Sequence, residues 1–192
     1  MASFPRETIG PGQTLFRAHK TKNPPPFYCV CGDCRFDPPA TKRRQYGSCC
    51  AAYEREIALL EHLAGVTTVN QRWVEQREIS PIKPTVDHKV AHLPQAITGG
   101  EWGIDEDLQV GVDRRLSKGW GAAFREADFQ GVLHASRRDP VHAGECVAFF
   151  GTPPGENHSC LARGVPEKIT TALRVEMARR FNIHFFPPAP LV

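Results

Sequence analysis

Apolar residues recur at helical spacing within residues 46–65. Steps of i, i+4, i+7 and i+11 predict the buried face of one short helix, formed by Tyr53, Ile57, Leu60 and Ala64. Gly65 ends the pattern where a left-handed C-terminal cap would stand. Glu61 lies one turn after Ile57, on the flank of this face. The helix alone favours a solvated glutamate at the edge of the core, and a carboxylate in a cleft is the alternative.

Elsewhere the pattern predicts a mixture of strands and helices. Short strands are expected at 14–19, 132–136, 145–150 and 182–186, and weaker β-leaning stretches at 66–80 and 83–93. Helices are expected at 113–126 and from Pro166 to about Arg180, and loops at 95–109 and 151–164. Because strands and helices do not alternate regularly, the expected class is α+β. The chain is interpreted as a single domain over 1–192, with extended ends at 1–13 and 187–192.

The overall charge is mild, with 24 Lys and Arg against 21 Asp and Glu and a formal net charge of +3. This balance gives no reason to expect nucleic-acid or membrane binding, and it permits a polyanionic small molecule as ligand. No apolar run is long enough to span a bilayer, and the N-terminus lacks a signal-peptide pattern. A cytoplasmic location is therefore expected. The small basic run 41–44 is expected to be solvated.

The cysteines do not follow the pattern of a secreted disulfide framework, because their number is seven and Cys49 and Cys50 are adjacent. Cys31 and Cys34 have zinc-knuckle spacing, with Cys29 close by, but no second pair follows. His19 and Cys49 are the nearest loose candidates. Reduced thiols and no bound metal are therefore expected. A non-enzymatic binding module stabilised by zinc at Cys29, Cys31 and Cys34 remains an alternative.

Two arginines and a serine stand at positions where chemistry is possible. Arg17 interrupts a short apolar strand, and Arg35 precedes an aromatic residue. Each guanidinium could hold a phosphate, or Arg17 could be an edge-strand charge and Arg35 an ion-pair partner of Asp33 or Asp37. Ser136 ends a short strand and could bind a ligand or cap the following turn.

Several of these segments, taken in order, resemble the RES domain family. The segments are Phe16-Arg-Ala-His19, Gly32-Asp-Cys-Arg-Phe36, Ala58-Leu-Leu-Glu61 and Gly131-Val-Leu-His-Ala-Ser-Arg137, followed by the strand 145–150. The resemblance covers about residues 14 to 151. Two positions depart from the family pattern, since Cys50 and His134 stand where the family has tyrosines, and Tyr46 or Tyr53 could supply a ring instead.

The resemblance implies an ADP-ribosyltransferase-like fold with a mixed β-sheet core and a few surrounding helices. It also implies that the chain is the toxin enzyme of a RES–Xre toxin–antitoxin module, which binds NAD+ as its substrate. Such an enzyme cleaves the nicotinamide–ribose bond as a glycohydrolase or phosphorylase and depletes NAD. A mono-ADP-ribosyltransferase that modifies a protein is the alternative. An Xre-type antitoxin or an immunity protein is the expected partner, and a homodimer is possible.

The resemblance also implies a set of site residues. Glu61, Arg17, Arg35 and Ser136 are the expected catalytic residues. Glu61 would stabilise the oxocarbenium-like ribose, and the two arginines would bind the pyrophosphate. Ser136 would hydrogen-bond the ribose or the amide, and Phe36 or Tyr46 would stack on nicotinamide.

Overall fold

The computed structural model describes residues 1–23, 25–42, 45–151, 155–156 and 160–187. Most strands form one large mixed sheet in the order β1-β7-β8-β9-β4-β2-β6-β11, with β12 also paired to β6. Their bounds are β1 Arg6–Ile9, β2 Leu15–Lys20, β4 Gly47–Ala52, β6 Arg77–Pro84, β7 His88–His92, β8 Gly131–Ala135, β9 Glu145–Gly151, β11 Leu161–Arg163 and β12 Glu167–Lys168. Only the β7–β8 pair is parallel among the described pairs of this sheet.

Two small pairings lie outside the main sheet. β3 (Phe27–Tyr28) pairs with β10 (Gly155–Glu156), and β5 (Thr68–Asn70) pairs in parallel with β13 (His184–Phe186). The helices are α1 Arg55–Leu63, α2 Gln71–Glu75, α3 Leu93–Gly99, α4 Asp107–Val110, α5 Arg114–Glu126 and α6 Thr171–Phe181, with a 3₁₀ turn at Ala40–Lys42. The large mixed sheet with its separate helices confirms the α+β prediction.

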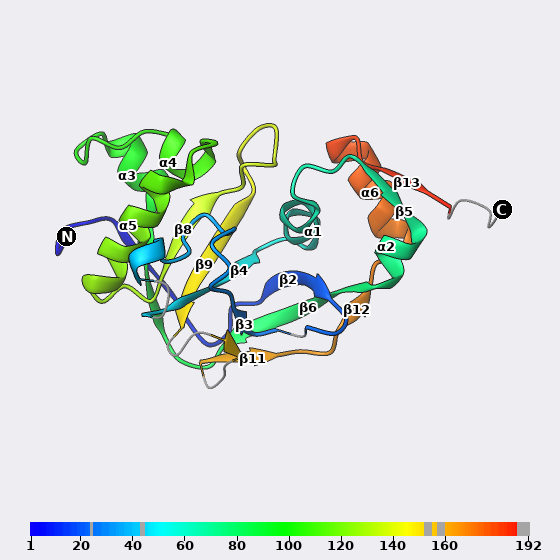
Figure 1. Cartoon of the computed structure of the whole chain (residues 1–192), viewed down its shortest axis with the longest axis horizontal. Coiled ribbons are helices and arrows are strands. Elements are labelled where there is room, and N and C mark those ends of the chain that lie inside the picture. The colour runs from blue at the N-terminus through cyan, green and yellow to red at the C-terminus, as the bar shows by residue number, and fades with distance from the viewer. Residues whose placement is uncertain (24, 43–44, 152–154, 157–159, 188–192) are drawn as a thin grey trace.

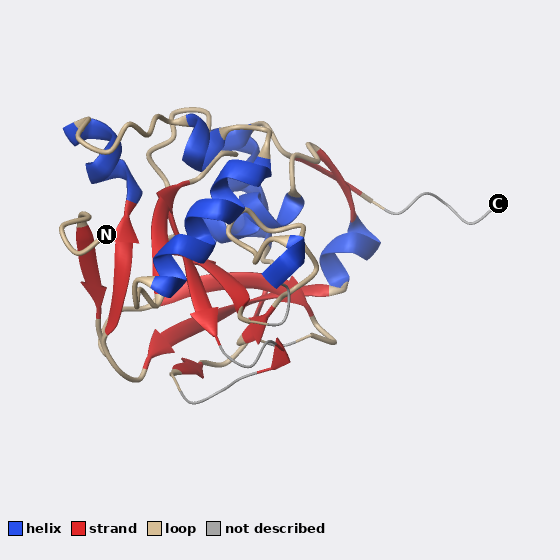
Figure 2. Cartoon of the chain, turned by 60° about the vertical axis from the view of Figure 1, so that its left-hand side comes forward, coloured by secondary structure: helices blue, strands red, loops and turns tan. Residues whose placement is uncertain are grey.

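The helices fall into two groups, as Figure 1 shows. Helices α3, α4 and α5 lie beside β8, whereas α1, α2 and α6 lie near β2 and β6 (Figure 1). Figure 2 shows the strands of the main sheet passing beneath the helices. Within the second group, helix α1 lies nearest to the middle of the sheet and contacts β2, β4 and β9.

Each helix group has its own apolar cluster. Helix α1 contributes Ile57, Leu59, Leu60 and Leu63, which pack with Met177 and Leu173 of α6. The other cluster gathers aromatic rings around α5: Phe4, Phe36, Tyr46, Phe124 and Phe129. Because burial of large apolar side chains is the main stabilising term, the two clusters fix the helices on the sheet. The pocket described below lies between these two clusters.

Most of the predicted regular elements are present, with shifted bounds. Strands β2, β8, β9 and β13 and helix α5 occur where the pattern predicts them. The predicted helix over 46–65 is wrong in its first half, because residues 47–52 form β4, a strand paired to β9 and β2. Its small side chains suit a central strand that is covered on both faces, which removes any alternation in the sequence.

Other differences have local causes. Residues 6–9, within the expected extended end 1–13, form β1 and pair with β7, so this segment is part of the main sheet. The expected loop at 95–109 contains most of α3 and the start of α4, and a short helix, α2, interrupts 66–80. Helix α6 begins after Thr170 rather than at Pro166, because β12 first pairs with β6 and the Thr170 side chain caps the helix.

Parts of some predictions lie outside the described residues. These are positions 43–44 of the basic run, 152–154 and 157–159 of the loop 151–164, and 188–192 of the C-terminal end. Within the described part of the chain, no helix combines the length and apolar character that crossing a membrane requires.

Candidate active site

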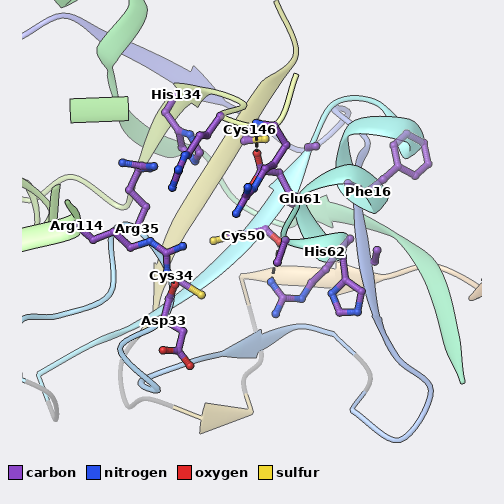
Figure 3. A pocket seen from close by; sticks show the side chains of 18 residues that line it. Phe16, Asp33, Cys34, Arg35, Cys50, Glu61, His62, Arg114, His134 and Cys146 are labelled. Carbon is purple, nitrogen blue, oxygen red and sulfur yellow. Dashed lines mark hydrogen bonds between the residues drawn. The ribbon is translucent and has the colours of Figure 1, made fainter. Parts of the chain in front are cut away.

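A pocket of about 230 Å³ opens between α1 and the loop that follows β3. One side, the helix wall, consists of α1 and β2 and carries Arg17, Glu61 and His62. The opposite side, the loop wall, consists of residues 29–37 (the cysteine loop) and Arg114 at the start of α5. Figure 3 shows Arg35 and Arg114 on one side and Glu61 and His62 on the other, with Cys50 between them.

The residues that line the pocket carry a net positive charge. Five arginines line it, Arg17, Arg35, Arg114, Arg137 and Arg138, against two carboxylates, Asp33 and Glu61. Among the described residues, none of these five arginines forms an ion pair with a carboxylate. Their charges therefore remain available to an anionic ligand.

Glu61 is positioned by helix packing and by a buried serine. The apolar face of α1 is anchored in the core, and Glu61 extends from its flank into the pocket. Ser136 Oγ donates a hydrogen bond of 2.6 Å to Glu61 Oε1, and the Arg138 backbone N–H lies 3.4 Å from the same oxygen. No hydrogen bond from the described residues reaches Glu61 Oε2. One oxygen is thus held by the protein, and the other has no such restraint.

Ser136 itself is fully buried and is not among the residues that line the pocket. Its backbone N–H donates to Gly144 O at 2.6 Å, and its hydroxyl accepts from the N–H groups of Arg138 and Asp139. The structure therefore places it behind Glu61, where it both organises the turn after β8 and orients the carboxylate. Direct contact between Ser136 and a ligand is not what this geometry provides.

Helix α1 ends against one of the pocket arginines. Ala64 and Gly65 both have left-handed backbone, with φ of 53° and 94°. A Cβ on Gly65 would stand 2.5 Å from Arg138 Nη1, so the guanidinium lies against the helix end, and the positive φ at this position favours glycine. The left-handed cap of α1 is therefore Ala64, one residue before the predicted position, and Gly65 continues the left-handed turn after it.

Arg17 is a half-buried cation on the floor of the pocket. Its Nη1 donates to Cys50 O at 2.7 Å, which ties β2 to β4. Its Nε is buried without a hydrogen-bond partner. Because a buried donor without a partner is costly, this guanidinium is suited to a ligand that accepts hydrogen bonds.

Arg35 reaches across the loop wall to the α4–α5 connection. Its Nη2 donates to Gly111 O at 2.8 Å, and its Nη1 lies near Ser117 Oγ and Leu108 O. Burial, followed by the nearby charges of Arg114 and Arg137, lowers the pKa of Arg35 to about 10. The ion pair with Asp33 or Asp37, considered from sequence, is absent from the described ion pairs.

The two rings expected to stack on a ligand lie in the core instead. Phe36 and Tyr46 are each 1% exposed, and neither lines the pocket. The Tyr46 hydroxyl donates to Phe36 O, and the Phe36 ring packs on His134. Sequence spacing alone could not separate a ring beside the pocket from a ring beneath it, because Phe36 directly follows the pocket residue Arg35. Phe16 is among the lining residues, and its ring, at the outer edge of the pocket, packs against the Arg55 guanidinium (Figure 3).

Sequence reasoning did not select the two histidines of the pocket, His62 and His134. Burial, more than any other cause, lowers the pKa of each to about 4, so both are neutral at neutral pH. His134 Nδ1 lies 2.9 Å from Ala135 O, and since a carbonyl only accepts, Nδ1 carries the proton. The departure from the family pattern at Cys50 and His134 was the available signal, since both residues line the pocket.

The structure also brings the clustered thiols together. The side-chain ligand atoms of Cys29, Cys31, Cys34 and Asp37 all lie within 4.8 Å of one another. The loose candidates do not join them, because His19 bonds Ser80 and Lys20 O, and Cys49 is fully buried outside the group.

Comparisons with known proteins give two findings. The model of the family described as "RES domain" matches residues 14–169. Among solved structures, the toxin–antitoxin complex MbcT–MbcA of M. tuberculosis contains a similar chain, with a TM-score of 0.67, 18% identity, and coverage of 90% of this chain and 92% of that one. At this identity the likeness establishes a shared fold. No curated protein matches.

Proposed function

Because the chain belongs to the RES domain family, we propose that it is a toxin enzyme that binds NAD+ and cleaves its nicotinamide–ribose bond. Water or phosphate would accept the ADP-ribose group, in hydrolysis or phosphorolysis. The observation that carries the proposal is the carboxylate of Glu61, held by Ser136 in a pocket with five arginines outside any described ion pair.

The arginines supply what a dinucleotide requires. NAD+ has a pyrophosphate with two negative charges, and planar guanidinium groups bind phosphate oxygens through paired N–H donors. Arg17 brings a buried Nε without a partner, and Arg35 is fixed at its far side by Gly111 O. We assign these two to the pyrophosphate, one from each wall. Arg114, Arg137 and Arg138 add to the positive potential that attracts the substrate.

Glu61 supplies the charge that the reaction needs. Breaking the bond between nicotinamide and ribose produces neutral nicotinamide and an oxocarbenium-like sugar, and a fixed carboxylate stabilises that cation. The hydrogen bond from Ser136 to Oε1 leaves Oε2 to approach a ribose hydroxyl or the developing cation. Ser136 then acts through Glu61 as a positioning residue.

The remaining pocket surface suits an uncharged ring. Phe16 lines the helix wall, and His62 and His134 add two neutral imidazoles, because burial holds each pKa near 4. Nicotinamide leaves as a neutral ring, because its nitrogen keeps the electron pair of the broken bond, and a neutral lining suits this product. The two imidazoles would take the stacking role that the sequence suggested for Phe36 or Tyr46.

An antitoxin partner belongs to the same proposal. The similar chain from M. tuberculosis was solved in a toxin–antitoxin complex. An Xre-type antitoxin that covers the pocket would keep NAD+ from its arginines, and residues of negative charge on it would complement them.

The test is nicotinamide release by the purified chain incubated with NAD+, with and without phosphate. Mass analysis of the second product separates ADP-ribose from its phosphorylated form. Adenine-labelled NAD+ in the same reaction reveals any transfer to protein, which would favour the transferase alternative. Glu61→Gln should slow release by about 100- to 1,000-fold, because it removes a charge aimed at the transition state.

Glu56→Gln is the matched control, since it alters a carboxylate of the same helix outside the pocket. Its activity should equal that of the unaltered chain. Absence of nicotinamide release at high enzyme concentration, or full activity of Glu61→Gln, would refute the proposed function.

A further inference from the structure

The cysteine loop, residues 29–37, gathers three thiols and one carboxylate around a common point. The ligand atoms of Cys29, Cys31, Cys34 and Asp37 are mutually within 4.8 Å, and all three cysteines are free. Cys50 lines the pocket but is not part of this group. The sequence offered only one pair with metal-ligand spacing, and folding adds the other two ligands from Cys29 and Asp37.

The separations are close to those of a tetrahedral metal site. Zinc–sulfur bonds of ~2.3 Å and zinc–oxygen bonds of ~2.0 Å require ligand atoms ~3.5–3.8 Å apart. Cys31 Sγ and Asp37 Oδ2 are 3.6 Å apart. The four ligand atoms, which lie within 4.8 Å of one another, can therefore reach an ion if the side chains rotate enough to move them by about 1 Å. The path of the backbone does not need to change.

The backbone of the loop is folded for sulfur ligands. The Cys31 N–H lies 3.1 Å from Cys29 Sγ, and the Asp33 N–H lies 3.4 Å from Cys31 Sγ. Such N–H contacts stabilise thiolates and are the outer interactions that orient metal ligands. Gly32, with φ of 84°, makes the turn between the two cysteines of the pair.

The electrostatics of the loop point to a cation at its centre. Asp37 is 0% exposed and has no cationic partner among the described ion pairs. It accepts from the N–H groups of Gly32 and Cys34 and from the Ser48 hydroxyl. A buried carboxylate is normally paired or bound to a metal, and an ion beside Oδ2 would meet this requirement.

Basic side chains surround the outside of the loop. Lys118 Nζ donates to Gly32 O at 2.6 Å, and Arg114 donates to Asp33 O. Three thiolates, one carboxylate and a divalent cation sum to a charge of −2, which these two cations offset. Soft sulfur ligands in this number favour zinc over magnesium or calcium.

We propose that Cys29, Cys31, Cys34 and Asp37 bind one Zn²⁺ ion, which fixes the loop wall of the pocket. The site is structural, since all four coordination positions are filled by protein. Its consequence for the pocket comes from chain connectivity, because Cys34 is followed directly by Arg35 and both line the pocket. The ion thus holds Arg35 on the loop wall without taking part in bond cleavage.

The first experiment measures metal in the full chain carrying Glu61→Gln, so that loss of NAD does not limit production. The protein is purified under reducing conditions and its zinc is quantified after denaturation. We expect one zinc per chain. After chelation, titration with Zn²⁺ against a chromophoric chelator should restore one ion per chain, and Co²⁺ should give the visible absorption of tetrahedral thiolate coordination.

Variants then identify the ligands. Cys31→Ser and Cys34→Ser should each lose most of the zinc, whereas Cys160→Ser, which alters an exposed thiol outside the group, should keep one ion. Asp37→Cys should raise the thiolate-to-cobalt absorption per ion by about a third, because a fourth sulfur replaces an oxygen. Unchanged intensity would remove Asp37 from the ligand set.

A reduced chain that contains no zinc and takes up neither Zn²⁺ nor Co²⁺ would overturn the inference. So would zinc that persists in both cysteine variants. The titration of the unsubstituted loop keeps the test valid if a cysteine variant fails to fold. The outcome is separate from the proposed function: zinc without nicotinamide release contradicts only the activity, and activity without zinc contradicts only the metal site.

Discussion

The two walls of the pocket hold their arginines and carboxylates by different physical means. The helix wall is anchored by apolar burial, with Leu59 and Ile57 of α1 completely buried. The loop wall has one large apolar anchor, Phe36, and the rest of its shape depends on polar contacts to Asp37 and on Lys118 and Arg114 of α5. Apolar burial is insensitive to salt and pH, whereas polar anchoring responds to both. The comparison indicates a rigid catalytic side and a binding side that depends on its charges or on a metal.

The largest effect should come from the core of the helix wall. Leu59→Ala removes a fully buried side chain from the cluster beneath α1, so we expect the free energy of unfolding to fall by about 2–5 kcal/mol. Urea denaturation measures it, at low and at high salt. The loss should be the same at both, and a salt-dependent loss would contradict apolar anchoring of this wall.

Lowering the pH should reduce the stability of the fold through His134, which lines the pocket between the two walls. The pKa of His134 lies near 4 in the folded chain, chiefly because of burial, with Glu61 and Arg35 as the charged groups acting on it. The unfolded chain, with a histidine pKa near ~6.5, takes up the proton first, so stability falls as pH decreases from about 6.5 to 4.

The contribution of His134 is on the order of 3 kcal/mol. His134→Asn, whose amide can replace the Nδ1–H donor to Ala135 O, should flatten the dependence of melting temperature on pH in that range. An unchanged slope would mean that His134 is already protonated or accessible in the folded protein. His62, whose pKa is also lowered to about 4, contributes to the remaining slope together with His19 and His88, whose pKa values burial also lowers.

Ser136 is expected to affect the proposed reaction through its hydrogen bond to Glu61 on the helix wall. Ser136→Ala removes the 2.6 Å hydrogen bond to Glu61, and bonds to charged groups contribute about 1.5–3 kcal/mol. We expect kcat for nicotinamide release to drop about 10- to 100-fold with little change in KM. Ser136→Thr, which retains the hydroxyl, should recover part of the rate. A change confined to KM would instead indicate that Ser136 contacts the substrate.

The smallest effect should come from one polar tie of the loop wall. Lys118→Met removes the hydrogen bond to Gly32 O and should cost about 1 kcal/mol or less in unfolding free energy. It should also increase proteolytic cleavage within 29–37, which limited proteolysis detects. A loss as large as that of Leu59→Ala would show that the two walls are not anchored differently.

The sequence predicts the elements and site residues of the pocket best where a helix or strand buries only one of its faces. The period of Ile57 and Leu60 predicted the second half of the 46–65 helix, and Glu61 on its flank does line the pocket. The order of Arg17, Arg35, Glu61 and Ser136 placed the candidate residues, of which the first three line the pocket. The same local reasoning failed for residues 47–52, whose small side chains are covered on both faces and show no period.

What the sequence by itself determined is which segments bury apolar surface and which charged groups interrupt them, because periodicity records the contact of one element with the core. The tertiary structure alone decided which groups meet. The order of strands in the sheet sets Arg17 of β2 beside Cys50 of β4 and Ser136 behind Glu61, although 75 positions separate the last two. It also turned Phe36 and Tyr46 inward and brought Asp37 to three cysteines, since burial and convergence are properties of distance in space and not of spacing along the chain.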